Sequence, residues 1–382
     1  MMITRLKLKN WRNFLDADIP FSDRTYLLGA NASGKSNLLD AFRFLRDVSK
    51  TQGGGLQKAV FDRGGIQKLR CLHTRRDPDV RIEVHVSESA DSSPDWKYIL
   101  AFKNEPRGER RTLISSEEVY NKKEECVLCR PDSRDKNDVA RLTQTAIEQI
   151  QVNEKFRELA KFFGGVTYLH LVPQLLKFSD QIGGKFLEGD PFGQGFLERL
   201  ARTSEDTRNK RLKRIEQALT IVVPHFQELR FIRDDVTGRP HLEARYIHYH
   251  PKAGWQREEQ FSDGTLRLIA LLWILQEGNS LLLLEEPELS LNNGVVAQIP
   301  LLFQRIQSSR KQRTRQIFVS THSEALLSNR GINPKGVLLL EPAREGTKIR
   351  NVDNKEEQLL HDGFSIADVL MPEVTPATVG HR

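Results

Sequence analysis

The chain has 382 residues, of which 38% are hydrophobic, and its 58 Lys and Arg exceed its 51 Asp and Glu to give a formal charge of +7. This length and composition allow a full buried core and suggest two or three structural units. No apolar run approaches the ~20 residues that span a bilayer, and residues 1–7 lack the apolar core of a secretory signal. These features argue against a membrane protein, so we expect a soluble, cytoplasmic protein whose basic excess favours polyanions.

The first informative motif follows a short apolar run, Tyr26 to Leu28. Residues 29–36 read Gly-Ala-Asn-Ala-Ser-Gly-Lys-Ser, which is the full spacing of a phosphate-binding loop. In such a loop the backbone N–H groups surround the phosphate oxygens, Lys35 contacts the β- and γ-phosphates, and Ser36 reaches a magnesium ion. Apolar side chains at helical spacing over residues 38–45 complete the expected strand, loop and helix. The sequence therefore predicts a site for ATP and Mg²⁺. Its loop residues are Gly29, Asn31, Gly34, Lys35 and Ser36.

Strand-like alternation continues at residues 80–86 and 96–102, and it predicts a β-rich first lobe over residues 1–130. Glycine-rich connections precede these strands. Gln67 lies in one of them and is a candidate for a glutamine that senses the metal and the attacking water, although a surface glutamine is the simpler interpretation.

The first lobe ends on a lone C-x-x-C motif, Cys126 to Cys129. A structural zinc site would need a second pair of ligands, which the motif lacks. Strand spacing would send the two side chains to opposite faces of a sheet. We therefore expect three free thiols in this chain, as is usual in the cytosol.

Residues 131–220 form a predicted helical insertion with a connecting strand. Apolar residues recur at helical spacing from Asp135 to Phe163, and a second helical segment runs from Gly195 to Ala218. The second segment includes the basic cluster Arg208–Arg214, and another basic cluster spans Arg305–Arg315. Either cluster is as consistent with a solvated helix face as with contact to nucleic acid.

Residues 221–382 form the second predicted lobe. Its nearly apolar helix, Leu266 to Leu275, starts just after Phe-Ser-Asp-Gly-Thr, so the positive end of the helix dipole falls at Ser262, Asp263 and Gly264. Continuous apolar runs at residues 281–284, 317–320 and 336–340 are typical of parallel strands that are buried on both faces.

Two adjacent carboxylates, Glu285 and Glu286, end the first of these buried strands. Unpaired carboxylates at such a position would be costly, and a magnesium ion bound with ATP phosphates removes this cost. We expect Glu285 to hold the metal through water and Glu286 to polarise the water that attacks the γ-phosphate. His322 follows a later core strand and is expected to contact the γ-phosphate and orient this water.

These elements resemble the ABC-type ATPase heads of the RecF, SMC and OLD group, and most closely the stand-alone predicted ATPases of the AAA_21 type. The resemblance implies an α/β fold: a two-lobe ABC-type P-loop ATPase head with a β-rich first lobe, a mainly parallel core sheet and a helical insertion. It extends the phosphate loop to Asn37. It also implies a homodimer in which two heads bind head to tail, so that Ser262, Asp263 and Gly264 complete the partner's ATP site. The matching residues are 2–13, 29–37, 261–272, 281–291, 319–327 and 346–370.

Departures from the pattern narrow the function. The Ser-Asp-Gly-Thr signature and Glu285 differ from the usual transporter residues, SMC-like arms are missing, and too few residues follow His322 for the nuclease domain of OLD proteins. The resemblance implies a sensor ATPase of a bacterial anti-phage defence system with a separately encoded effector protein. The alternatives are a RecF-like DNA-repair ATPase that binds DNA directly, and a scaffold that binds ATP without turnover. Assembly beyond the dimer stays open.

Overall fold

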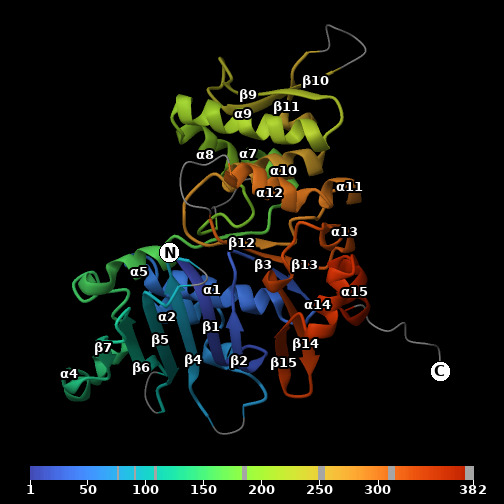
Figure 1. Ribbon diagram of the computed structural model, residues 1–382. Coiled ribbons are helices and arrows are strands. Elements are labelled where there is room, and N and C mark those ends of the chain that lie inside the picture. The colour runs from blue at the N-terminus through green and yellow to red at the C-terminus, as the bar shows by residue number, and fades with distance from the viewer. Residues whose placement is uncertain are drawn as a thin grey trace, which may run out of the picture.

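The computed structural model describes residues 1–74, 77–89, 92–106, 110–182, 187–247, 254–308 and 315–374. In these residues the chain folds into three sheets with helices packed around them (Figure 1). No helix in the described ranges is both long enough and apolar enough to cross a membrane.

The first sheet is antiparallel and makes up the β-rich first lobe, in the order β2-β1-β4-β5-β6-β7. Along its strand β1 the side chains of Ile3, Leu6 and Leu8 are buried, whereas those of Arg5 and Lys9 are exposed. This alternation is what predicted strands in the region. The strands are β1 (Met2–Trp11), β2 (Phe14–Pro20), β4 (Val80–Ser87), β5 (Trp96–Asn104), β6 (Thr112–Asn121) and β7 (Cys126–Arg130).

The second sheet is the core of the molecule, in the order β15-β14-β3-β13-β12-β8. All neighbouring strands are parallel except the β14–β15 hairpin. The predicted parallel core sheet is therefore confirmed, and it takes strands from all three expected segments of the chain. The strands are β3 (Arg24–Leu28), β8 (Thr167–Leu169), β12 (Leu282–Glu285), β13 (Ile317–Thr321), β14 (Val337–Ala343) and β15 (Gly346–Asn351).

Both faces of the core sheet are buried, which explains the continuous apolar runs. Leu281 and Leu283 pack into one apolar cluster with the first lobe and α1. Leu282 and Leu284 pack into the other, with α10 and α12. In Figure 1 the first sheet lies on one side of the core strands, while α10 and α12 lie on the other. The bounds of these helices are α1 (Lys35–Ser49), α10 (Asp263–Ile274) and α12 (Ile299–Ser308).

A small antiparallel sheet of order β11-β10-β9 lies beside α9 at the end of the molecule away from the first lobe (Figure 1). Its strands are β9 (Phe226–Arg233), β10 (Pro240–Tyr246) and β11 (Gln256–Arg257). The remaining helices are α2 (Leu56–Phe61), α3 (Ile66–Leu69), α4 (Ser133–Asn137), α5 (Arg157–Gly164), α6 (Pro173–Lys177), α7 (Ser179–Ile182), α8 (Phe196–Arg202), α9 (Glu205–Val222), α11 (Asn293–Val296), α13 (Glu324–Leu327), α14 (Asn354–His361) and α15 (Ile366–Val374).

The predicted helix from Asp135 to Phe163 is wrong for most of its length. The segment begins in α4 and ends in α5, but residues 144–153 pass through turns and bends. Glu117 on β6 accepts hydrogen bonds from the backbone N–H groups of Ala146, at 2.7 Å, and Ile147, at 3.2 Å. Because these N–H groups are paired through a tertiary contact, they do not need the hydrogen bonds of a helix. The helical spacing of the apolar residues therefore does not determine the backbone conformation here. The second predicted helix forms as two helices, α8 and α9.

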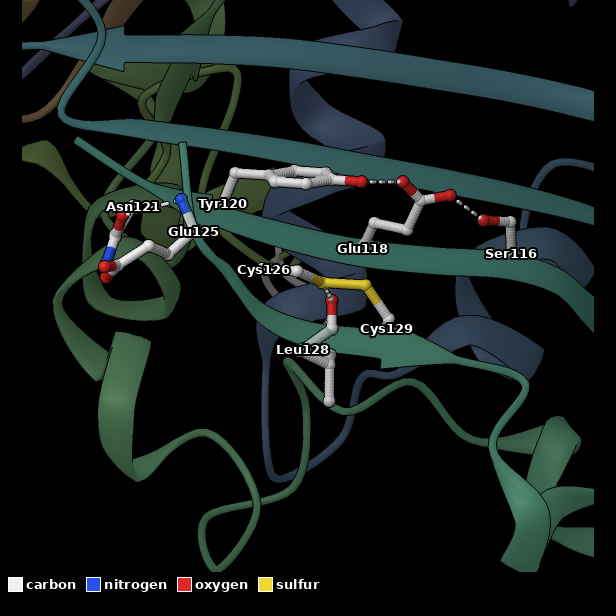
Figure 2. Close-up of a disulfide and its surroundings, with 8 residues drawn as sticks. All are labelled: Ser116, Glu118, Tyr120, Asn121, Glu125, Cys126, Leu128 and Cys129. Atoms are coloured by element: carbon white, nitrogen blue, oxygen red, sulfur yellow. Dashed lines mark hydrogen bonds between the residues drawn. A yellow bond between two sulfur atoms is a disulfide. The ribbon is translucent and has the colours of Figure 1, made fainter. Parts of the chain in front are cut away.

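The expectation of three free thiols is also wrong, because Cys126 and Cys129 form a disulfide on β7 (Figure 2). Val119 on β6 lies opposite Leu128, whereas the next residue, Tyr120, lies opposite Cys126. One extra residue, Val127, is therefore inserted as a bulge. This insertion brings two side chains at an odd spacing to the same face, which simple alternation cannot do.

Candidate active site

The phosphate-binding loop connects the end of β3 to the start of α1, as its spacing predicts. Gly34 is the N-cap of α1 with φ of 103°, and a Cβ there would lie 2.1 Å from the side-chain nitrogen of Asn13. A Cβ on Gly29 would lie 2.8 Å from the carbonyl oxygen of Leu340. Both positions therefore require glycine, and the loop backbone stays open to an anion at the positive end of α1.

Lys35 lies inside this loop with its ammonium group hydrogen-bonded to loop carbonyls. Its Nζ donates to the oxygen of Gly29 at 2.6 Å and to that of Ala30 at 3.1 Å. Burial lowers the pKa of Lys35, and the nearby carboxylates of Glu286 and Glu285 oppose this effect. The ammonium group is thus bonded to the loop backbone and is close to the acidic pair. At this position its positive charge would balance the negative charge of bound phosphates.

The two asparagines of the loop differ in their surroundings. Asn31 is exposed at the tip of the turn. Asn37 donates its side-chain amide to Oδ1 of Asn13 at 2.7 Å, and Asn13 donates in turn to the backbone oxygen of Ser33 at 3.1 Å. Asn37 therefore braces the loop against the turn between β1 and β2.

Glu285 ends β12 beside the loop. The hydroxyl of Ser36 donates to one oxygen of the Glu285 carboxylate, and the hydroxyl of Tyr168 on β8 donates to the other. Burial and then the hydrogen bond to Glu285 raise the pKa of Tyr168, so this hydroxyl stays protonated and acts as a donor. Ser36 and Glu285 place two hard oxygen ligands side by side, a set that suits Mg²⁺ when phosphate oxygens and water supply the rest.

Glu286 and His322 come together at the ends of neighbouring strands. Nδ1 of His322 lies 3.1 Å from Oε1 of Glu286. Glu286 has φ of 45°, a left-handed conformation that is strained for a residue other than glycine. Its carbonyl oxygen accepts a hydrogen bond at 3.0 Å from Nη2 of Arg267, and Nη1 of the same side chain donates to the carbonyl oxygen of Leu289. Because Arg267 lies on α10, its hydrogen bonds connect this helix to the turn that positions the side chain of Glu286.

Arg267→Met should lower both stability and turnover. The side chain of Arg267 is only 3% exposed, and its loss leaves two buried carbonyls without a donor, at a cost of about 1–3 kcal/mol. Because the turn also positions Glu286, we expect kcat to fall more than KM changes, measured by ATPase assay alongside urea unfolding. Arg315→Met is the matched control, since Arg315 is equally buried but donates to Ser280 and Glu277. An equal loss of kcat in both variants, per folded molecule, would show that Arg267 has no special role.

Glu288 is a site residue that the sequence did not single out. Its Oε1 accepts hydrogen bonds from the hydroxyl of Thr321, at 2.6 Å, and from the backbone N–H of His322, at 3.3 Å. Burial raises its pKa, and these donors oppose the effect. Glu288 thus fixes the end of β13 that carries His322. The signal available in the sequence was a third acidic residue close behind Glu286.

The glutamine candidate is located away from these contacts. Gln67 lies on α3 with an exposed side chain, and it is absent from the lining of the cavity beside Ser36. Gln174 instead lies in the first turn of α6, shortly after β8, the strand that pairs with β12. Because parallel strands end at the same edge of a sheet, Gln174 comes from the side that carries Glu285. A glutamine shortly after the apolar run at 166–171 was the signal that would have found it.

The signature residues lie at the start of α10. Ser262 is the N-cap, and its Oγ accepts a hydrogen bond from the backbone N–H of Thr265 at 3.1 Å. Asp263 follows in the first turn. Gly264 is buried against the loop after β12, where a Cβ would lie 2.7 Å from the carbonyl oxygen of Ser290. The start of α10 therefore packs closely against the loop that follows β12 in the same chain.

Two separate cavities open at the two halves of this machinery. The cavity beside Ser36 has a volume of about 710 Å³, and its lining includes seven Lys and Arg and four Asp and Glu. Ser36 and Asn37 line it at the loop end, and its other walls come mainly from α1 and α2. The cavity beside Ser262 has a volume of about 210 Å³. The two share no lining residue. The cavity beside Ser262 is lined by no residue of the phosphate loop and by neither Glu285 nor Glu286.

Comparison with known proteins identifies the family of this chain. The AAA_21 family model, described as "AAA domain, putative AbiEii toxin, Type IV TA system", matches residues 24–328, which is more than half of the chain. A stretch of 90 residues is 31% identical to the DNA replication and repair protein RecF of Synechocystis sp.. A stretch of 62 residues is 40% identical to RecF of Chlamydia caviae. These matches cover 23% and 17% of the two RecF proteins, well under two thirds of their length.

Solved structures show the same fold. An SMC head bound to the C-terminal winged-helix domain of ScpA aligns with a TM-score of 0.57 and 16% identity, over 94% of this chain and 100% of that one. An SMC head with an extended coiled coil from Pyrococcus furiosus, bound to the C-terminal domain of ScpA, aligns with a TM-score of 0.54 and 14% identity, over 94% and 98% of the two chains. The chain therefore belongs to the AAA_21 family of ATPases, and it has the fold of an ABC-type head such as those of SMC proteins.

Proposed function

We propose that two copies of this chain close head to tail around ATP, so that the signature of each copy completes the phosphate site of the other. The observation that carries this proposal is that the cavity beside Ser262 is lined by no residue of the phosphate loop and by neither Glu285 nor Glu286, so the signature would meet a phosphate site only on another copy. A closed C₂ dimer would bring both halves together twice.

Within each composite site we assign roles by geometry. Ser36 and Glu285 would hold Mg²⁺, which when bound would neutralise charge on the phosphates. Glu286 would accept a proton from the attacking water, and His322 would orient that water and the γ-phosphate. For the glutamine that senses metal and water, we favour Gln174 over Gln67, because it follows a strand of the core sheet. In the single chain its side-chain amide donates to Asp263, so this role requires the amide to turn toward the metal when ATP binds.

Mixing two inactive variants tests the shared sites. Lys35→Ala removes the phosphate contact, and Ser262→Arg blocks the signature. Each variant alone should be inactive. An equal mixture should recover about a quarter of the wild-type ATPase rate, because half of the dimers are mixed and each of these has one intact site. If dimers exchange and no activity returns, the sites do not span two chains.

The structure also determines which signature variant to use. Ser262 is exposed, so its replacement should cost only the N-cap, about 1 kcal/mol. Gly264 is a poor choice because any Cβ would meet the carbonyl oxygen of Ser290 in the same chain. A loss of activity at Gly264 would then report misfolding as readily as a blocked signature.

For the biological role, we propose a regulatory ATPase of a bacterial anti-phage defence system that acts through a separately encoded effector. The family description, which refers to a toxin of a type IV TA system, supports a role beside a toxic partner. Co-expression with the protein encoded by the neighbouring gene should produce toxicity that depends on Lys35, whereas the chain alone should leave growth and nucleic acids intact. Cleavage of DNA or RNA by the purified chain would contradict this role.

A RecF-like ATPase that binds DNA directly is the second candidate, supported by the 31% identity to RecF over 90 residues. The two basic clusters, Arg208–Arg214 and Arg305–Arg315, provide little support for DNA binding. Arg208 stacks on the ring of Phe231 at 4.1 Å and Arg211 on that of Trp273 at 5.2 Å, and residues 309–314 lie outside the described residues. DNA that stimulates the ATPase in a salt-sensitive way would favour this candidate over the first.

A further inference from the structure

An ion pair joins the signature to a helix from the middle of the chain. Nζ of Lys177, the last residue of α6, lies 2.6 Å from Oδ1 of Asp263. Nε2 of Gln174, on the same helix, donates to Oδ2 of Asp263 at 3.3 Å. The side chain of Lys177 is only 12% exposed, whereas that of Asp263 is 41% exposed. The lysine is thus held beneath the carboxylate, which remains open toward the surface.

An acidic residue at this position needs an explanation. Asp263 is the first residue of α10, where the partial positive charge of the helix attracts anions. In the proposed dimer the same helix start must receive the γ-phosphate that is bound by the partner. A free carboxylate there would repel the phosphate and would itself occupy the helix end.

We propose that Lys177 is a positioning residue that makes this acidic signature compatible with the partner's γ-phosphate. By pairing with Asp263, it cancels the negative charge and keeps the carboxylate turned toward α6. The hydroxyl of Ser262 and the first backbone N–H groups of α10 are then left for the phosphate. This inference rests on the proposed head-to-tail dimer and adds to it a residue from outside the signature.

The position of α6 in the fold supports the pairing. The helix follows β8 after a short connection, and β8 is anchored beside the chain's own ATP site through the hydrogen bond from Tyr168 to Glu285. Leu176 on α6 is buried in the same apolar cluster as Leu266 of α10. The burial of Leu176, the residue before Lys177, therefore anchors the end of α6 in the same core as α10.

ATP-dependent dimerisation tests the inference, measured by light scattering in a Glu286→Gln background that prevents turnover. Lys177→Met should weaken dimerisation by about tenfold or more, because it leaves Asp263 charged near the partner's phosphate. Nucleotide affinity of the monomer should not change, since its own phosphate loop is intact. Adding Asp263→Asn to the same chain should restore dimerisation. Lys210→Met is the matched control, because Lys210 forms an exposed pair with Asp206 on α9 and should have no effect.

The possible outcomes separate this inference from the proposed dimer. If Lys177→Met dimerises as tightly as its parent, the inference is wrong while the dimer stands. If dimerisation is lost and Asp263→Asn does not restore it, Lys177 has only a structural role, and the inference is again wrong. If the parent itself stays monomeric in ATP, the head-to-tail dimer is wrong, and the role of Lys177 falls with it.

Discussion

Glu286→Gln should slow ATP hydrolysis by about 10²- to 10⁴-fold while ATP binding is retained. The substitution keeps the shape of the side chain but removes the carboxylate that accepts a proton from water. The hydrogen bond with Nδ1 of His322, now 3.1 Å from Oε1, can still form to the amide. Because the chemical step is blocked after closure, dimers with trapped ATP should accumulate. Phosphate release and the dimer fraction in ATP measure the two effects.

Glu324→Gln is the matched control for this prediction. Glu324 begins α13 two residues after His322, but its side chain is exposed. The Glu324→Gln variant should hydrolyse ATP at the wild-type rate, since the substitution removes one negative charge from the same end of the core sheet but contacts no site residue. Wild-type hydrolysis by Glu286→Gln would instead transfer the role of general base to another residue, with Glu285 the first to examine.

Lys35→Ala should lose nucleotide affinity by about 10- to 100-fold, the effect of removing a charge-assisted contact to phosphate. Burial lowers the pKa of Lys35, while Glu286 and Glu285 raise it, so a bound polyanion should further favour the ammonium form. Fluorescent ATP titration measures the affinity. The variant also leaves the carbonyls of Gly29 and Ala30 without their donor, so thermal unfolding without nucleotide should be followed in parallel.

Lys213→Ala provides the control for this second prediction. Lys213 is exposed on α9 and pairs with Glu216. Its loss changes the net charge of the chain by the same amount, so it should leave nucleotide affinity unchanged if Lys35 acts locally. An equal loss of affinity in both variants would mean that general electrostatic attraction, and not a contact in the loop, determines binding.

Much of the core site was predictable because its parts are local. The phosphate loop needs consecutive backbone N–H groups and two glycines, and the structure places Gly29 and Gly34 where a Cβ would clash. The acidic pair was predictable because two carboxylates at the end of a buried apolar run demand a partner. Continuous apolar strands likewise indicate a sheet that is covered on both faces, which Leu281 to Leu284 confirm.

Periodicity misled where tertiary contacts supplied the hydrogen bonds. Between Asp135 and Phe163 the apolar residues recur as in a helix, but the buried carboxylate of Glu117 binds the backbone of the middle of this segment. At Cys126 and Cys129 a bulge reversed the expected faces of the strand. Neither the hydrogen bonds of Glu117 nor the bulge can be recognised in the local sequence pattern, since both depend on the residues of the neighbouring strand β6.

The sequence by itself determined which chemistry to expect of this protein, because the phosphate loop, the acidic pair and the signature are short runs that can be recognised from their local composition. Only the tertiary structure decided which other residues contact them. Tyr168 reaches Glu285 across 117 positions, and Lys177 reaches Asp263 across 86. Such contacts depend on which strands pair and in which register. No local pattern contains that information, because the energy that selects the pairing comes from the whole core.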